Sequence, residues 1–214
     1  MLVSVIYVLL LHVTPHGYKA KTALLLTFSD PGAIGLILAG GIVLLEKDQG
    51  VHDCLFVTPL RLREYLIAKA VSISAISTAS AWAIQGFALG LPEAPVRFTL
   101  GILLTSWLFT FLSIGIVARA KDMNGFIWLS QLYAFPLAVP LLGCFDIGPS
   151  ALYWGLPTQG SIILLEAAHR SVSMGNTLAA FAVLTAGTLA AYGWAYRSFA
   201  RSVLSGIGKG AGGK

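Results

Sequence analysis

Few residues in this chain could carry chemistry, and none of them falls into a familiar catalytic spacing. The sequence has no His-Glu-x-x-His zinc motif, no Gly-x-Ser-x-Gly nucleophile turn and no cysteine–histidine zinc spacing. It also lacks the Gly-x-x-x-x-Gly-Lys-Ser/Thr loop that holds ATP phosphates. Glu166 and His169, spaced i and i+3, make half of a carboxylate-bridged metal site, which needs a second such pair. We therefore expect no catalytic, cofactor or metal site, and no enzyme activity of the chain by itself.

Composition predicts a membrane protein. Of 214 residues, 57% are hydrophobic and 11% are charged, and the mean hydropathy is +0.81. Such values are typical of chains that lie in a bilayer rather than of soluble domains. The net charge of +5 does not indicate a nucleic-acid partner, because the basic residues are spread over loops and helix ends. Two cysteines, Cys54 and Cys144, are too few for a disulfide framework.

One long polar segment, residues 46–69, interrupts this apolar sequence. Gly50 allows the chain to leave the preceding helix. Val51, Cys54 and Leu55 then follow at i, i+3 and i+4, which predicts one apolar face of a short surface helix. Thr58-Pro59 is typical of a helix start, with a hydroxyl N-cap followed by proline at the first helical position.

Two carboxylates flank this short helix at the predicted membrane surface. Glu46 precedes it and Glu64 follows it. Each is either a solvated interface charge or an ion-pair latch with Lys47, Arg61 or an arginine of a partner.

The polar segment resembles the cytoplasmic loop of type 2 ATP-binding-cassette (ABC) exporter permeases, above all the permease subunits of fluoroquinolone exporters. The residues that carry the resemblance are Glu46, Lys47, Gly50, Leu55, Thr58, Pro59, Leu60, Glu64, Tyr65, Leu66 and Lys69. An Asp-Pro pair also opens the second membrane helix of those exporters, as Asp30-Pro31 does in this sequence. The resemblance is strongest over residues 30–75.

This resemblance implies a mechanism and a set of partners. Residues 50–57 would form the coupling helix, which docks on a separate cytoplasmic ABC ATPase that holds ATP and magnesium. A second permease, either a copy of this chain or a related one, would complete the transporter. A pair of short extracytoplasmic helices would lie between spans five and six.

Apolar runs predict an all-α integral membrane protein, a six-helix transmembrane bundle in a single domain over residues 1–214. The expected spans are 1–14, 31–47, 66–91, 98–118, 125–145 and 172–196, with a disordered tail at 203–214. Asp30 would cap the second span with Pro31 at its first position, after a loop and a short in-plane segment at 14–30. The first run is short for a bilayer, so it is either a tilted helix or the remainder of a segment that starts upstream.

Basic residues orient this bundle. One side of the bilayer would carry ten of them, namely Lys47, Arg61, Arg63, Lys69, Arg119, Lys121, Arg197, Arg201, Lys209 and Lys214. The other side would carry four, namely Lys19, Lys21, Arg97 and Arg170. The side rich in Lys and Arg is expected to be cytoplasmic, so both termini are expected in the cytoplasm. The bundle itself is expected in the cell's inner or plasma membrane.

Candidate residues of a substrate path lie in the third and fifth spans. The third has a stripe of small residues and the hydroxyls of Ser74, Ser77 and Ser80, which serve either helix packing or a translocation path. In the fifth span, Pro136 and Pro140 remove backbone hydrogen bonds from the helix. They are either an ordinary feature of membrane helices or a hinge near the substrate path. Gln131 carries the side-chain amide of that span, which either forms a hydrogen bond between helices or contacts a ligand.

These observations favour a permease that is energised from outside. The predicted spans carry almost no ionisable groups, whereas ion-coupled transporters need them at membrane depth. The sequence is therefore interpreted as the permease subunit of a type 2 ABC exporter that moves an apolar or amphiphilic substrate, such as a drug, outward. The alternatives are a non-transporting membrane protein, such as an assembly or receptor-like subunit, and an intramembrane enzyme.

Overall fold

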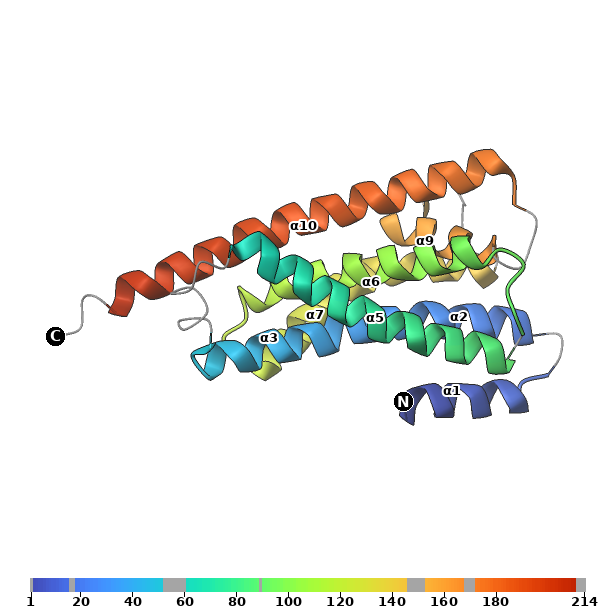
Figure 1. Ribbon diagram of the computed structural model, residues 1–214, viewed down its shortest axis with the longest axis horizontal. Coiled ribbons are helices and arrows are strands. Elements are labelled where there is room, and N and C mark those ends of the chain that lie inside the picture. The colour runs from blue at the N-terminus through green and yellow to red at the C-terminus, as the bar shows by residue number, and fades with distance from the viewer. Residues whose placement is uncertain are drawn as a thin grey trace.

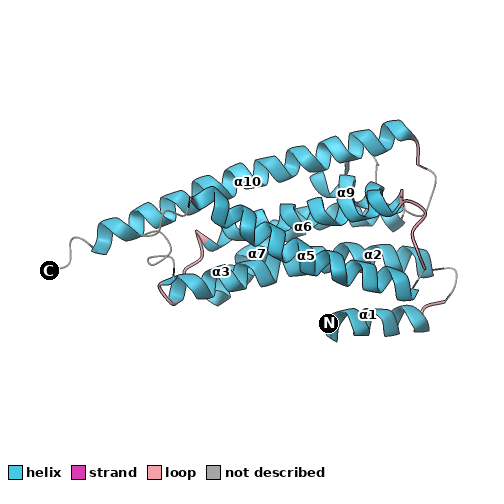
Figure 2. Ribbon diagram, in the orientation of Figure 1, coloured by secondary structure: helices cyan, strands magenta, loops and turns pink. Residues whose placement is uncertain are grey.

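The computed structural model describes residues 2–15, 18–51, 61–88, 90–145, 153–167 and 172–210, and this part of the chain is helical throughout, without a strand (Figure 2). The elements are α1 (Leu2–Val13), α2 (Lys19–Ala33), the π-helix η1 (Ile34–Leu38), α3 (Ala39–Asp48), α5 (Leu62–Ala88), α6 (Pro95–Val117), α7 (Met123–Ala138), the 3-10 helix η2 (Val139–Phe145), α9 (Pro157–Glu166) and α10 (Met174–Gly210). The prediction of an all-α fold is therefore confirmed for the described residues, as a helical membrane bundle.

Five helical stretches of the described chain are long and apolar enough to cross a bilayer. They are 21–48, 62–87, 95–117, 123–143 and 174–201. Helix α1 has 12 residues and reaches about 18 Å, which is short of a hydrocarbon core of ~30 Å. It lies against α5 and α2 at one edge of the bundle (Figure 1). The sixth span therefore remains a prediction.

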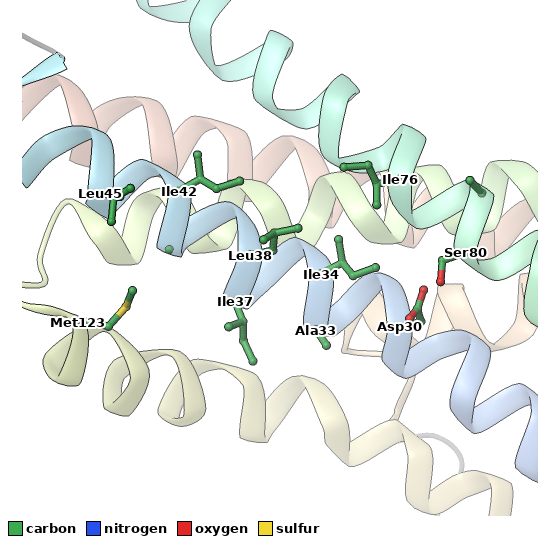
Figure 3. Close-up of a pocket in the computed structure, with 12 residues that line it drawn as sticks. Asp30, Ala33, Ile34, Ile37, Leu38, Ile42, Leu45, Ile76, Ser80 and Met123 are labelled. Carbon is green, nitrogen blue, oxygen red and sulfur yellow. The ribbon is translucent and has the colours of Figure 1, made fainter. Parts of the chain in front are cut away.

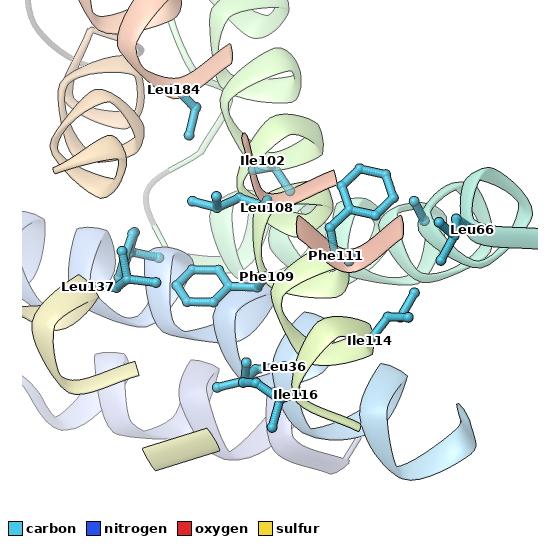
Figure 4. Packing of buried hydrophobic residues seen from close by; sticks show 14 of the residues in the cluster. Leu36, Leu66, Ile102, Leu108, Phe109, Phe111, Ile114, Ile116, Leu137 and Leu184 are labelled. Atoms are coloured by element: carbon cyan, nitrogen blue, oxygen red, sulfur yellow. The ribbon is translucent and has the colours of Figure 1, made fainter. Parts of the chain in front are cut away.

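Helix α6 forms the centre of the bundle. It packs against α10, α5, α9, α3 and η1, and it is the most buried of the long helices. It carries apolar residues on all sides and no charge beyond Arg97 near its start, as a helix surrounded by others requires. Its side chains Ile102, Phe109 and Ile114 point in different directions into the core (Figure 4).

The second long helix begins earlier than the sequence predicts. Residues 19–48 run as one rod through α2, η1 and α3, with Pro31 in its interior (Figure 1). The expected loop at 14–30, and Asp30 as an N-cap, are therefore wrong. Membrane helices tolerate proline where neighbouring groups satisfy the freed backbone. The π-helix follows Pro31 closely, and within it the Leu36 carbonyl accepts a hydrogen bond from the Ser113 hydroxyl on α6.

Small residues bring this rod close to α6. A Cβ on Gly35 would lie 2.9 Å from the Phe109 Cβ and 3.1 Å from the Ser106 carbonyl oxygen. One on Gly40 would overlap the ring of Phe126 at the start of α7. Close backbone approach of this kind supplies the van der Waals contact that holds helices together in lipid.

The helix ends gather at two ends of the bundle. We call the left end in Figure 1, where α3 and α6 finish and α5 and α7 begin, the loop end, and the right end the far end. Helix α5 starts at Leu62, with Arg61 outside it, so the restart expected at Thr58-Pro59 lies later in the chain. Helix α10 continues past the bundle to Gly210, where a disordered tail was expected from 203, because extending a formed helix costs little.

The last third of the chain holds one departure from regular α-helix and one short additional helix. The fifth span changes from α-helix to 3-10 helix at Val139, between Pro136 and Pro140. A pair of short helices was expected after this span, and the described residues there contain α9, which is buried against α10 and α6 at the far end.

Candidate functional site

An apolar groove runs along the rod, beside α5 and the start of α7. It encloses about 770 Å³. Its lining consists of Asp30, Ala33, Ile34, Ile37, Leu38, Gly41, Ile42, Leu45, Ile76, Ala79, Ser80 and Met123. Figure 3 shows Leu45 and Met123 towards one end of the groove and Asp30 and Ser80 at the other. Ile37, Leu38 and Ile76 are about half exposed, so the groove opens sideways from the bundle.

Asp30 is the charged residue of this lining. Its side chain is 2% exposed. The Ser80 hydroxyl on α5 donates to its carboxylate, and Tyr7 on α1 lies near enough to interact with it electrostatically. The Oδ2 atom is buried and has no hydrogen-bond partner among the described residues. A carboxylate with an unsatisfied oxygen at membrane depth is costly, and such residues mark functional sites.

Sequence reasoning missed Asp30 because it treated the Asp30-Pro31 pair as a helix start. The signal that could have found it is the apolar run 23–28 directly before the pair, which together with 31–45 makes a single span. The second span therefore carries an ionisable side chain, Asp30, where the sequence predicted almost none.

Of the residues predicted for the substrate path, Ser80 lies in the groove lining, whereas Ser74, Ser77, Gln131, Pro136 and Pro140 lie outside it. Ser74 accepts a hydrogen bond from Trp107 Nε1 at 3.1 Å, and the hydroxyls of Ser77 and Ser106 are 3.2 Å apart. Both serines are buried and join α5 to α6, which agrees with the packing role that the sequence left open. Gln131 and Pro136 lie on the exposed side of α7, and Pro140 is buried in η2.

A cluster of polar and aromatic contacts ties the rod to its neighbours at the loop end. The Glu46 carboxylate on α3 accepts a hydrogen bond from the Tyr65 hydroxyl at 2.7 Å and forms an ion pair with Lys69. Tyr65 in turn stacks on Phe199 of α10, with ring centroids 5.7 Å apart. We call Glu46, Tyr65, Lys69 and Phe199 the loop-end clamp. Glu46 is thus the latch that the sequence left open, but its described partners are on α5.

Further contacts brace the same end. The Lys47 Nζ donates to the Ala120 carbonyl at 3.3 Å, which ties α3 to the connection between α6 and α7. The Arg119 guanidinium lies over the Trp194 ring and donates to the Tyr133 hydroxyl at 3.0 Å. All the helices that end or begin here are therefore linked to a neighbour.

The loop is joined to this end of the bundle at two positions with a defined backbone conformation. Gly50 has φ +68°, a left-handed conformation that strains other residues, and its N–H donates to the Lys47 carbonyl. Val51 follows it in helical conformation. On the other side, Glu64 accepts from the Arg61 N–H at 3.1 Å, half of a capping box at the start of α5. Cys54, Leu55, Thr58 and Pro59 lie outside the described residues, and with them most of the expected coupling helix.

Comparison with known proteins places both regions within one family. The family described as Fluoroquinolones export permease protein Rv2686c-like matches residues 9–196, which includes the groove and the loop-end clamp apart from Phe199. The chain belongs to this family. The resemblance predicted from the loop is thereby confirmed, and it extends well beyond residues 30–75.

Two relatives from Mycobacterium tuberculosis are similar to this family member. They are Fluoroquinolones export permease protein MT2761 of strain CDC 1551 / Oshkosh and Fluoroquinolones export permease protein Rv2687c of strain ATCC 25618 / H37Rv. Each is 30% identical over 156 residues, covering 72% of this chain and 66% of the relative, just under two thirds of its length. Family membership and the five long apolar helices together indicate a multi-pass membrane protein of a permease family.

Proposed function

We propose that this chain is the membrane-spanning subunit of an ATP-driven type 2 ABC exporter, which moves an apolar or amphiphilic substrate outward. A separate cytoplasmic ATPase subunit binds and hydrolyses ATP with its magnesium. Six spans in each of two permeases, copies or relatives, form the translocation unit. The loop end faces the cytoplasm of a cell whose inner or plasma membrane holds the chain.

The observation that carries this proposal is the braced loop end. A loop that transmits force must be joined stiffly to the helices that it moves. The segment 51–60 is bounded by Gly50 on the rod and by the capped start of α5, and the Glu46 carboxylate joins these same two helices. A push on the loop would therefore move α3 and α5 together rather than separately.

The path of the motion follows from the same contacts. Tyr65 passes a displacement of α5 to α10 through Phe199, and Lys47 passes one of α3 to α6 and α7 through Ala120. Closure of the ATPase pair would thus rock the rod and α5 against α6. The groove lies between the rod and α5, where this rocking would change its width.

The test is affinity purification of the full chain in mild detergent from cells that produce it naturally, followed by identification of any ABC ATPase that co-purifies. We expect the ATPase to co-purify with the wild type. Leu55→Asp should reduce co-purification about thirty-fold or more, because a charge in a desolvated central contact of a helix-in-groove interface costs ~2 kcal/mol or more.

Gln49→Asp is the matched control. It adds the same carboxylate to an exposed position next to the loop, where the backbone hydrogen bond of residue 49 is unaffected. If Leu55→Asp is expressed normally and retains the ATPase at the wild-type level, the loop only connects two helices. The exporter proposal would then lose its main support.

A further inference from the structure

We propose that the groove beside the rod binds a lipophilic amine, whose ammonium group pairs with Asp30 and whose apolar body lies along the rod. The chain would thus select cationic amphiphiles as cargo. That the groove is a cargo site rests on the proposed export function. Binding of the amine to the groove requires neither the ATPase nor a second permease.

The charge of the groove points to a cation. Asp30 is almost fully buried, one of its oxygens has no partner among the described residues, and Ser80 supplies a neutral hydroxyl. Among the described residues, the groove lining contains no Lys, Arg or His. A ligand ammonium would donate to the unsatisfied oxygen and balance the charge, and charge-assisted hydrogen bonds are about twice as strong as neutral ones.

The shape of the groove points to an amphiphile. Its polar groups, Asp30 and Ser80, lie at one end, and the residues from Ala33 to Leu45 that continue it are apolar (Figure 3). Asp30 and Leu45 are separated by fifteen positions of one helical rod, about 22 Å at ~1.5 Å per residue. A compact hydrophilic cation would leave most of this surface without contact.

The depth of Asp30 argues against an ordinary phospholipid as occupant. Nine positions separate Asp30 from Lys21 at the far end of the span, about 14 Å along the helix. A phospholipid head group would carry its phosphate into an apolar region next to a carboxylate, where like charges repel. An alkyl chain alone would leave the carboxylate unpaired. A cation without an attached anion avoids both costs.

The experiment measures probe binding to the full-length chain in phosphatidylcholine nanodiscs, by energy transfer from tryptophan to a dansyl group. One probe is a dansyl-tagged alkyl chain that ends in a primary amine, and the other is the same chain ending in a hydroxyl. At pH 7 the amine is charged. Empty nanodiscs supply the lipid background. We expect the wild type to bind the amine at least ten-fold more tightly than the alcohol, which corresponds to ~1.4 kcal/mol.

Two variants locate the binding. Asp30→Asn keeps the shape of the side chain and removes its charge, so it should weaken amine binding at least ten-fold and leave alcohol binding within two-fold. Ile37→Trp fills the half-exposed middle of the groove and should weaken both probes. Glu93→Gln, which removes an exposed carboxylate beyond α5 at the far end, should change neither.

Three outcomes would overturn the proposal. They are equal wild-type affinity for the two probes, amine binding that survives Asp30→Asn, and amine binding that survives Ile37→Trp. The first needs no variant, so it decides even if Asp30→Asn fails to fold. Because no ATPase is present, a failure here is separate from a failure of ATPase co-purification, which tests the exporter.

Discussion

Two carboxylates of the rod, Glu46 and Asp30, occupy opposite situations. Glu46 is about one-fifth exposed, accepts a hydrogen bond from Tyr65 and forms an ion pair with Lys69. Asp30, sixteen positions earlier on the same rod, is 2% exposed and has one oxygen without a described partner. The chain thus satisfies one carboxylate within its own fold and leaves the other facing an apolar groove.

This difference separates a structural role from a binding role. A charge whose partners are built into the fold stabilises the arrangement of helices and offers little to a ligand. A charge that the fold leaves partly unsatisfied costs free energy, and a ligand that pairs with it recovers some of that cost. We therefore expect the two sites to respond to mutation in opposite ways.

The largest effect is expected at the rod between the two carboxylates. Gly40→Ala should lower the stability of the bundle by about 1–3 kcal/mol, because the added methyl overlaps the Phe126 ring and the Ser113 hydroxyl. Thermal unfolding in detergent, followed by size-exclusion chromatography, measures the loss.

The adjacent Gly41→Ala is the matched control for this change. Its methyl would meet only the Met123 Cε at 3.8 Å, so stability should be unchanged or slightly raised. Equal effects of the two substitutions would show that the rod does not pack on α6 and α7 as described.

A smaller loss is expected at the loop-end clamp. Glu46→Gln keeps an acceptor for Tyr65 but leaves the Lys69 ammonium without its carboxylate, and we expect a cost of about 1–2 kcal/mol, since the pair is partly exposed. A double-mutant cycle with Lys69→Met isolates the pair. Additive losses in that cycle would mean that the pair does not bind the rod to α5.

A loss of about 1 kcal/mol is expected at the exit of the loop. Gly50→Ala places a Cβ in a left-handed conformation, and we expect the lower end of the usual cost of about 1–2 kcal/mol because no atom of the described residues lies within 4 Å to clash with it. Gly86→Ala on α5 has the same open surroundings without the positive φ, and it should be neutral. Unfolding midpoints that move equally for both would exclude strain at Gly50.

The smallest effect on stability is expected at the groove. Asp30→Asn removes a buried, partly unpaired charge, so the unfolding midpoint should stay the same or rise, in contrast to Glu46→Gln. The same thermal assay compares the two purified variants side by side. A midpoint that falls as far for Asp30→Asn as for Glu46→Gln would make Asp30 a second structural carboxylate and remove the contrast between them.

The sequence predicted what depends on composition and local backbone chemistry. The bounds of α6 follow from an uninterrupted apolar run that starts after a proline, and the turn at Gly50 follows from the need for a positive φ. The family could be predicted from the loop because its polar residues stand out in an apolar chain.

The sequence did not predict what depends on neighbouring helices. Asp-Pro is a common helix start in water, but a membrane span can hold the same pair in its interior, as residues 19–48 do. The partners of Glu46 lie 19 and 23 positions away on another helix, so no local pattern identifies them. The groove arises between elements far apart in the sequence and has no linear motif.

The measurement that tests the exporter account most directly is ATP-dependent accumulation of the dansyl amine in inside-out membrane vesicles. The vesicles come from cells that produce the chain together with the proposed ATPase subunit. We predict accumulation with the wild type, loss of accumulation with Leu55→Asp despite normal amine binding, and no accumulation without ATP. Accumulation by Leu55→Asp at the wild-type rate, or by vesicles that contain the chain without the ATPase, would contradict the account.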